Sequence, residues 1–77
     1  MTLRDKLKTD LKVERYNLTH LCDEAQISRA YLTRILGGYA SPSIHVCTSL
    51  ALAANRLTGL TTYTPDQFMT ITRIHHS

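Results

Sequence analysis

The chain has 77 residues, of which 43% are hydrophobic, and it carries a formal net charge of +3 at pH 7. This length predicts one domain over residues 1–77 with a single core, and the apolar fraction excludes a disordered chain. No apolar run approaches the ~18 residues of a membrane span. Residues 1–10 lack the apolar segment of a secretory signal peptide, so we expect a cytoplasmic protein that does not bind membranes.

Periodic apolar residues predict five helices, which cover about residues 3–16, 18–25, 28–36, 43–54 and 65–73. In the first, leucines recur at four-residue steps and form one apolar stripe of Leu3, Leu7 and Leu11. In the second, apolar residues recur at i, i+3, i+4 and i+7 from Leu18, which is typical of a short amphipathic helix. Asn17 precedes it as a candidate cap.

The third predicted helix follows a break at "QIS", with Ser28 as its cap, and its two faces differ in composition. At 100° per residue, one face carries only apolar and aromatic side chains. The other face carries Arg29, Ala30, Thr33, Arg34 and Gly37. The small residues Ala30 and Gly37 would let another molecule approach the helix backbone closely. A face built for solubility usually mixes opposite charges, yet no acidic residue occurs between positions 24 and 66. This face therefore favours binding to another molecule, with an ordinary solvated face as the alternative.

The last two predicted helices have clear start signals. Ser43 follows Pro42 and caps a helix that is apolar almost all round, which is typical of a central, buried helix. Thr64, Pro65 and Gln67 have the spacing of a capping box with proline at the first helical position. This last helix is too apolar for so small a chain to bury completely, so Phe68 and Ile71 are expected to cover the core in part. The candidate dimer-interface residues are Phe68, Met69, Ile71 and Ile74, with simple closure of the core as the alternative.

The polar face of the third helix suits the major groove of double-stranded DNA. Arginine is the residue that most often contacts guanine there, and alanine and threonine suit the thymine methyl group. Two short helices joined by a tight turn form a helix-turn-helix, whose second helix enters the groove. Helix starts near residues 17–19 and 41–44 present free backbone N–H groups to phosphate. The predicted phosphate-contacting residues are Thr19, Tyr39, Ser41 and Ser43.

The segment "LTHLCDEAQISRAYLTRILGGYASPSIHVCTSLALAA" resembles the lambda-repressor-like (Cro/XRE-type) helix-turn-helix family. Members typically have a "G-V-S" turn, then "R-x-Y-L-S-R-I", then "x-G-x-x-x-P-S"; here "QIS", "RAYLTRI" and "GGYASPS" occupy those places. The resemblance spans about residues 3–57 and implies an all-α, five-helix DNA-binding domain whose helix-turn-helix is formed by helices 2 and 3. The base-contacting residues that it implies are Ser28, Arg29, Ala30, Thr33 and Arg34. It also implies phosphate contacts from Tyr39 and Ser43, and core positions at Leu21, Ile27, Leu32 and Ile35.

Three residues depart from the family pattern. Leu18 stands where many members have a phosphate-binding glutamine, and Cys22 replaces a small alanine. Gln26 replaces the turn glycine, which costs strain if the backbone at this position has a positive φ.

The resemblance implies a small phage or bacterial Cro-like repressor that acts in the bacterial cytoplasm or nucleoid by occupying an operator. A homodimer would place two third helices on a near-palindromic duplex. The alternative is a protein-interaction module on the same fold, either an antitoxin or an antirepressor, that works through its apolar C-terminal helix.

Other sites receive little support from the sequence. Cys22 and Cys47 have no Cys-x-x-Cys spacing and fall on apolar faces, so we expect buried free thiols. The four histidines lack the spacing of a zinc site and are expected at the surface. No catalytic motif is present, so we expect neither an enzyme nor a bound metal or cofactor.

Overall fold

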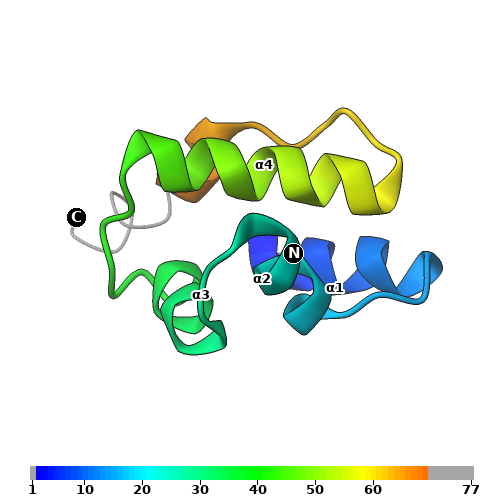
Figure 1. Cartoon of the computed structure of the whole chain (residues 1–77), viewed down its shortest axis with the longest axis horizontal. Helices are drawn as coiled ribbons and strands as arrows, with labels where there is room; N and C mark the ends of the chain where they lie inside the picture. The colour runs from blue at the N-terminus through cyan, green and yellow to red at the C-terminus, as the bar shows by residue number, and fades with distance from the viewer. Residues whose placement is uncertain (1, 70–77) are drawn as a thin grey trace.

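The computed structural model describes residues 2–69, and helices connected by short loops account for most of them. The helices are α1 (Leu3–Val13), α2 (Leu18–Ala25), α3 (Arg29–Leu36) and α4 (Ile44–Thr58), followed by helical residues 65–69. No strand occurs within residues 2–69, so the predicted all-α class is confirmed. Figure 1 shows α4 lying across α1 and α2, with α3 near the start of α4. After α4 the chain runs back alongside that helix to residues 65–69.

The start of each numbered helix is fixed by a side chain that accepts a backbone N–H from the first turn. Thr2 caps α1. Asn17 caps α2, Ser28 caps α3 and Ser43 caps α4, as the sequence predicts. In α2 the cap is reciprocal, because His20 Nδ1 also accepts the Asn17 N–H at 3.0 Å. Each such cap stabilises its helix by about 1 kcal/mol.

Two predicted helix ends are wrong, and backbone conformation gives the reason in each. Helix α1 ends at Val13 rather than at residue 16, because Arg15 adopts a left-handed φ of 63° and its N–H donates to the Lys12 carbonyl. Helix α4 continues past residue 54 to Thr58, where Gly59 takes φ 72° and ends it. The last helix begins at residue 65, and its predicted end at 73 lies outside the described residues.

The core lies between α4 and the layer formed by α1 and α2. The fully buried large side chains are Leu7, Leu11, Leu21, Leu32, Ile35, Cys47, Leu50 and Phe68. Helix α4 turns the small residues Ala51, Ala53 and Ala54 inward, which brings its backbone close to the neighbouring helices. Its outer side leaves Ile44 and Leu52 more than half exposed, so the expectation of a helix buried all round is wrong on that side.

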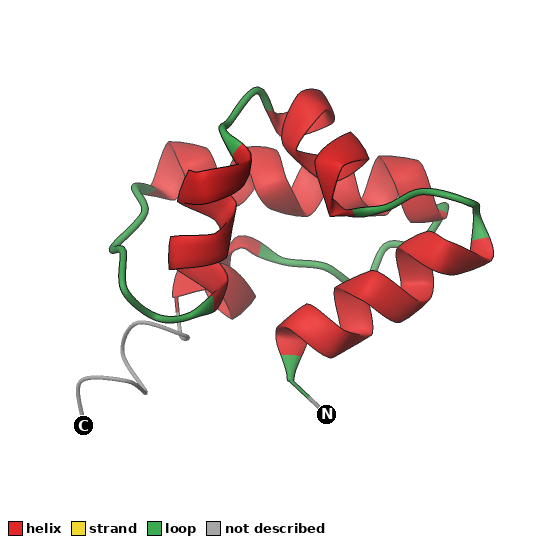
Figure 2. Ribbon diagram, turned by 90° about the horizontal axis from the view of Figure 1, so that it is seen from below, coloured by secondary structure: helices red, strands yellow, loops and turns green. Residues whose placement is uncertain are grey.

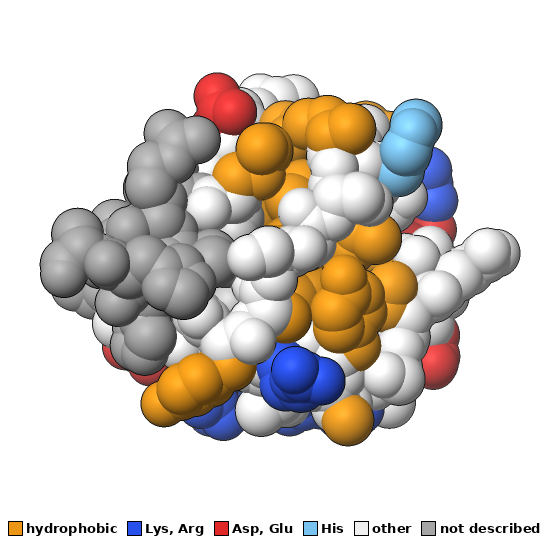
Figure 3. All heavy atoms as spheres, turned by 90° about the vertical axis from the view of Figure 1, so that its left-hand side faces the viewer, with side chains coloured by type: hydrophobic (Ala, Val, Ile, Leu, Met, Phe, Trp, Pro, Cys, Tyr) orange, Lys and Arg blue, Asp and Glu red, His pale blue; other side chains and the backbone are white. Residues whose placement is uncertain are grey.

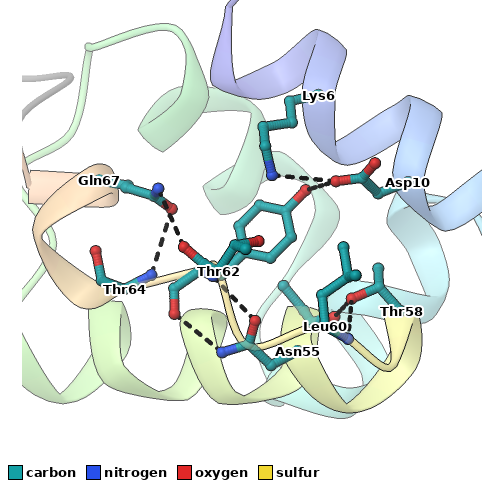
Figure 4. Close-up of polar contacts among 10 residues, drawn as sticks. Lys6, Asp10, Asn55, Thr58, Leu60, Thr62, Thr64 and Gln67 are labelled. Carbon is teal, nitrogen blue, oxygen red and sulfur yellow. Dashed lines mark hydrogen bonds and ion pairs between the residues drawn. The ribbon is translucent and has the colours of Figure 1, made fainter.

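A polar cluster fastens the segment after α4 to α4 and α1 (Figure 4). The Asn55 amide donates to the Tyr63 carbonyl at 2.9 Å and accepts the Tyr63 N–H at 3.0 Å. The Tyr63 hydroxyl donates to Asp10 at 2.6 Å, and Lys6 donates to the same carboxylate at 3.2 Å. These two hydrogen bonds, that of Tyr63 above all, lower the pKa of Asp10 below its ordinary value of 3.8. Burial and the Asp10 carboxylate raise the pKa of Tyr63.

Both cysteines are buried and free, as predicted, and burial raises the pKa of each thiol. Over residues 2–69, no helix combines the length and the apolar character that a bilayer-spanning segment requires.

Candidate nucleic-acid interface

The turn between α2 and α3 sets the orientation of α3 relative to α2. Gln26 adopts the left-handed conformation with φ 60° and ψ 45°. Its N–H donates to the Asp23 carbonyl, and the Ile27 N–H donates to the Cys22 carbonyl at 3.0 Å. The position is therefore one where glycine is free of strain and glutamine is not. Ile27, expected in the core, is only partly buried at the edge of it.

One face of α3 is held firmly by the core. Leu32 and Ile35 have no exposed surface, and Tyr31 and Leu36 are partly buried against the same cluster. Ser28 completes the first turn, because its hydroxyl accepts the Tyr31 N–H at 3.0 Å. The helix is thus fixed in its rotation. Figure 2, seen from below, shows the ribbon of α3 in front of the start of α4.

The opposite face is exposed and holds the residues that the sequence assigns to base contacts. Ser28, Arg29, Ala30, Thr33 and Arg34 are all exposed. The predicted division of α3 into an apolar inner face and a polar outer face is therefore confirmed, whereas contact with DNA stays a prediction. We call these five residues the α3 outer face.

Two hydrogen bonds on the α3 outer face join Arg29 and Thr33. Arg29 Nη1 donates to Thr33 Oγ1 at 3.0 Å. The Thr33 hydroxyl in turn donates to the Arg29 backbone carbonyl, also at 3.0 Å. The guanidinium of Arg29 is therefore tied to the helix that carries it.

The end of α3 differs from the prediction at Gly37. The sequence predicts a bare position at which another molecule could approach the helix backbone. The Tyr39 ring covers it instead, since a Cβ on Gly37 would lie 2.8 Å from Tyr39 Cδ2. Tyr39 itself is 72% exposed, so its ring extends the surface beyond the end of the helix.

The remaining predicted phosphate contacts lie in two segments, the first turn of α2 and the loop between α3 and α4. Thr19 is exposed in the first turn of α2, and Ser41 is exposed in the loop after α3. Ser43 is exposed at the start of α4, where its hydroxyl accepts the Val46 N–H at 3.3 Å. Figure 1 shows this loop running along one edge of the molecule, from α3 to the start of α4.

That edge also carries exposed apolar surface. Figure 3 looks onto it and shows apolar side chains gathered over the loop and the start of α4, with Lys and Arg side chains along the lower border. The large exposed apolar residues of these segments are Tyr39 and Ile44, the latter 52% exposed.

The two arginines of α3, Arg29 and Arg34, have no acidic partner among the described residues. Glu24 is the acidic residue nearest to Arg29 in the sequence. It pairs with Arg56 of α4 instead and so holds α2 against that helix. Arg34, and the donors of Arg29 that Thr33 does not engage, are therefore available to an outside acceptor such as a phosphate or a base.

Of the four predicted dimer-interface residues, two lie within the described part of the chain, and these two differ in burial. Phe68 is fully buried in the chain's own core, which corrects its assignment to a dimer contact and agrees with its expected part in the core. Met69 is partly buried. Ile71 and Ile74 lie outside the described residues, as do His75 and His76. In the part of the chain that is described, no three metal-binding side chains come together.

The sequence does not predict several of the polar contacts, and three of them show why. The Arg29–Thr33 hydrogen bond joins residues four apart on one helix, and that spacing was a usable signal. The His20 half of the α2 cap also lies three residues from Asn17, but histidine is not the usual residue there. The contact between Tyr63 and Asp10 joins residues 53 apart, and no local pattern points to it.

Comparison with known proteins found no matching family model, no matching curated protein and no matching solved structure.

Proposed function

We propose that this chain is a sequence-specific double-stranded DNA-binding regulator of the lambda-repressor-like (Cro/XRE-type) helix-turn-helix family. In this proposal it represses transcription in the bacterial cytoplasm or nucleoid by occupying an operator. One observation carries the proposal: an exposed helix face bears two arginines that form no ion pair within residues 2–69, while Leu32 and Ile35 on the opposite face are fully buried. Such a face offers guanidinium donors in a fixed direction.

The dimensions of α3 fit a major groove. Its eight residues make a helix about 12 Å long, and a helix with side chains is about 10–12 Å wide. A B-DNA major groove is about 12 Å wide. At about 3.4 Å per base pair, one α3 spans about three to four base pairs. Arg29 and Arg34 would contact base edges, and Ala30 leaves room for the helix to approach closely.

Three to four base pairs specify too little sequence for a single operator. A homodimer would place a second α3 about 34 Å away in the next major groove and double the information read. The surface for this contact is proposed to include Met69, Ile71 and Ile74. Sedimentation of the free protein and of its complex with a selected duplex tests the dimer, and a monomer in both conditions would exclude it.

Selection of bound sequences from random duplexes tests the proposal most broadly. We expect enriched sites with two half-sites related by near-palindromic symmetry. Arg29→Ala and Arg34→Ala should each weaken binding by about 1–3 kcal/mol and relax preference at one base pair. Arg4→Ala is the matched control, because Arg4 is exposed on α1 and its loss changes the net charge equally. Equal effects of all three variants would mean that the two α3 arginines contribute only their charge and do not contact specific bases.

Salt dependence separates DNA binding from the second candidate function, an antitoxin or antirepressor. The observation that favours the second is exposed apolar surface on α4, at Ile44 and Leu52. DNA binding should weaken steeply with salt, because log K falls in proportion to the number of neutralised phosphates. An apolar protein contact should not weaken in that way.

A further inference from the structure

We infer that Thr33 is a positioning residue, which holds the Arg29 guanidinium so that its free edge reads a guanine. This inference rests on the proposed function and deepens it, because it names the base and the residue that sets the geometry. Its basis is the pair of hydrogen bonds between these two residues, one from the Arg29 side chain to Thr33 and one from Thr33 to the Arg29 backbone carbonyl.

The Thr33 hydroxyl is committed in both directions. It donates its hydrogen to the Arg29 carbonyl at 3.0 Å, and its oxygen accepts from Arg29 Nη1 at 3.0 Å. A hydroxyl has one hydrogen to donate, so Thr33 has none left for a base. Within α3, its hydroxyl therefore acts on Arg29, and its methyl group is the part free to contact a thymine methyl.

The nitrogen that Thr33 engages leaves one edge of Arg29 complete. A guanidinium is a planar fork with five N–H donors. Nη1 lies on the Cδ side of this group, and Nε and Nη2 form the opposite edge. Because the hydrogen bond uses Nη1, the parallel N–H donors of Nε and Nη2 remain available. Two parallel donors match the N7 and O6 acceptors of guanine in the major groove.

Holding the side chain in advance should raise affinity. A free arginine has many rotamers and loses that freedom when it binds. An arginine already held on its helix loses less, which is the general advantage of preorganisation. Arg34, on the same face, has no such partner among the described residues and provides an internal comparison.

The test uses matched variants at position 33 and the best duplex selected by the wild-type chain. Thr33→Val keeps the shape and removes the hydroxyl, and Thr33→Ser keeps the hydroxyl. We expect Thr33→Val to weaken binding about five-fold, the equivalent of ~1 kcal/mol for one net hydrogen bond. It should reduce the sequence preference at the same base pair as Arg29→Ala does. Thr33→Ser should retain the wild-type preference at that base pair. Thermal unfolding of each variant checks that α3 is intact.

A double-mutant cycle separates positioning from direct contact. In the Arg29→Ala background, Thr33→Val should change affinity no further. If Thr33→Val costs as much there as in the wild type, Thr33 contacts DNA itself and the inference is wrong. If the wild type selects no sequence at all, the proposed function fails and the inference fails with it. If the wild type selects sites and Thr33→Val leaves every base preference unchanged, the inference alone fails.

A measurement on the free protein tests the positioning without DNA. The NMR order parameter of Arg29 Nε–H should exceed that of Arg34 in the wild type. It should fall to the Arg34 value in Thr33→Val and stay high in Thr33→Ser. Equal order parameters for the two arginines in the wild type would overturn the positioning role.

Discussion

Replacing Gln26 with glycine should stabilise the protein, because the turn before α3 holds this residue at φ 60°. A left-handed conformation costs a residue with a Cβ about 1–2 kcal/mol. Glycine avoids this cost, but it gives the unfolded chain more freedom, which offsets about 0.4–1 kcal/mol. The net gain is therefore about 0.5–1 kcal/mol, and the two backbone hydrogen bonds of the turn are retained. For a domain of this size, that corresponds to a rise in Tm of roughly 2–8 °C.

Thermal unfolding followed by circular dichroism measures the effect. Gln26→Ala keeps the Cβ and should change stability little, so it separates backbone strain from loss of the glutamine side chain. Gly59→Ala makes the reverse change at φ 72°, where an added Cβ would meet no atom within 4 Å. It should lose about 1 kcal/mol from the backbone alone. Destabilisation by Gln26→Gly, or equal stabilisation by Gln26→Ala, would show that backbone strain at residue 26 does not limit stability.

Three further predictions concern the rest of the fold. The lowered pKa of Asp10 stabilises the folded chain above pH 3.8, and this stabilisation is lost as pH falls through the lowered value. Tyr63→Phe should therefore flatten the acid limb of a plot of unfolding free energy against pH, and an unchanged limb would contradict the assigned cause. Phe68→Ala should lose about 3–5 kcal/mol in denaturant titrations, because the ring is fully buried. Leu52→Ala, at a site 56% exposed, should lose less than about 0.5 kcal/mol; similar losses for these two variants would contradict the burial of Phe68. Glu24→Gln should lose less than about 1 kcal/mol, and high salt should remove the difference; a larger, salt-independent loss would mean that Glu24 does more than pair with Arg56.

The parts of the fold that the sequence predicts well are those set by local chemistry. Caps such as Ser28 act within one helical turn, so the hydroxyl and the N–H that it accepts are close in sequence. The two faces of α3 follow from helical period alone, and Leu32 and Ile35 are buried accordingly. The strain at Gln26 was also expected from the glycine that the related pattern has there, and its positive φ agrees.

The parts that the sequence does not predict depend on contacts between distant segments or on competing local signals. The sequence leaves Phe68 both as a core residue and as a candidate dimer contact. Its full burial depends on the path of the chain after α4, which the helical spacing of apolar residues does not determine. The predicted end of α4 at residue 54 is too early, because asparagine and glycine both occur at helix ends and here only Gly59 adopts a left-handed φ. The bare position expected at Gly37 is covered by Tyr39, a neighbour whose ring direction depends on the loop conformation.

Contact between the α3 outer face and DNA is tested most directly by an NMR titration of the labelled chain with a duplex recovered by selection. We expect the largest backbone amide shifts in residues 28–36, with smaller shifts at Thr19, Tyr39 and Ser43. We also expect the Arg29 side-chain N–H signals to move on binding. Shifts that concentrate on the outer side of α4, around Ile44 and Leu52, and leave residues 28–36 unmoved would contradict that contact.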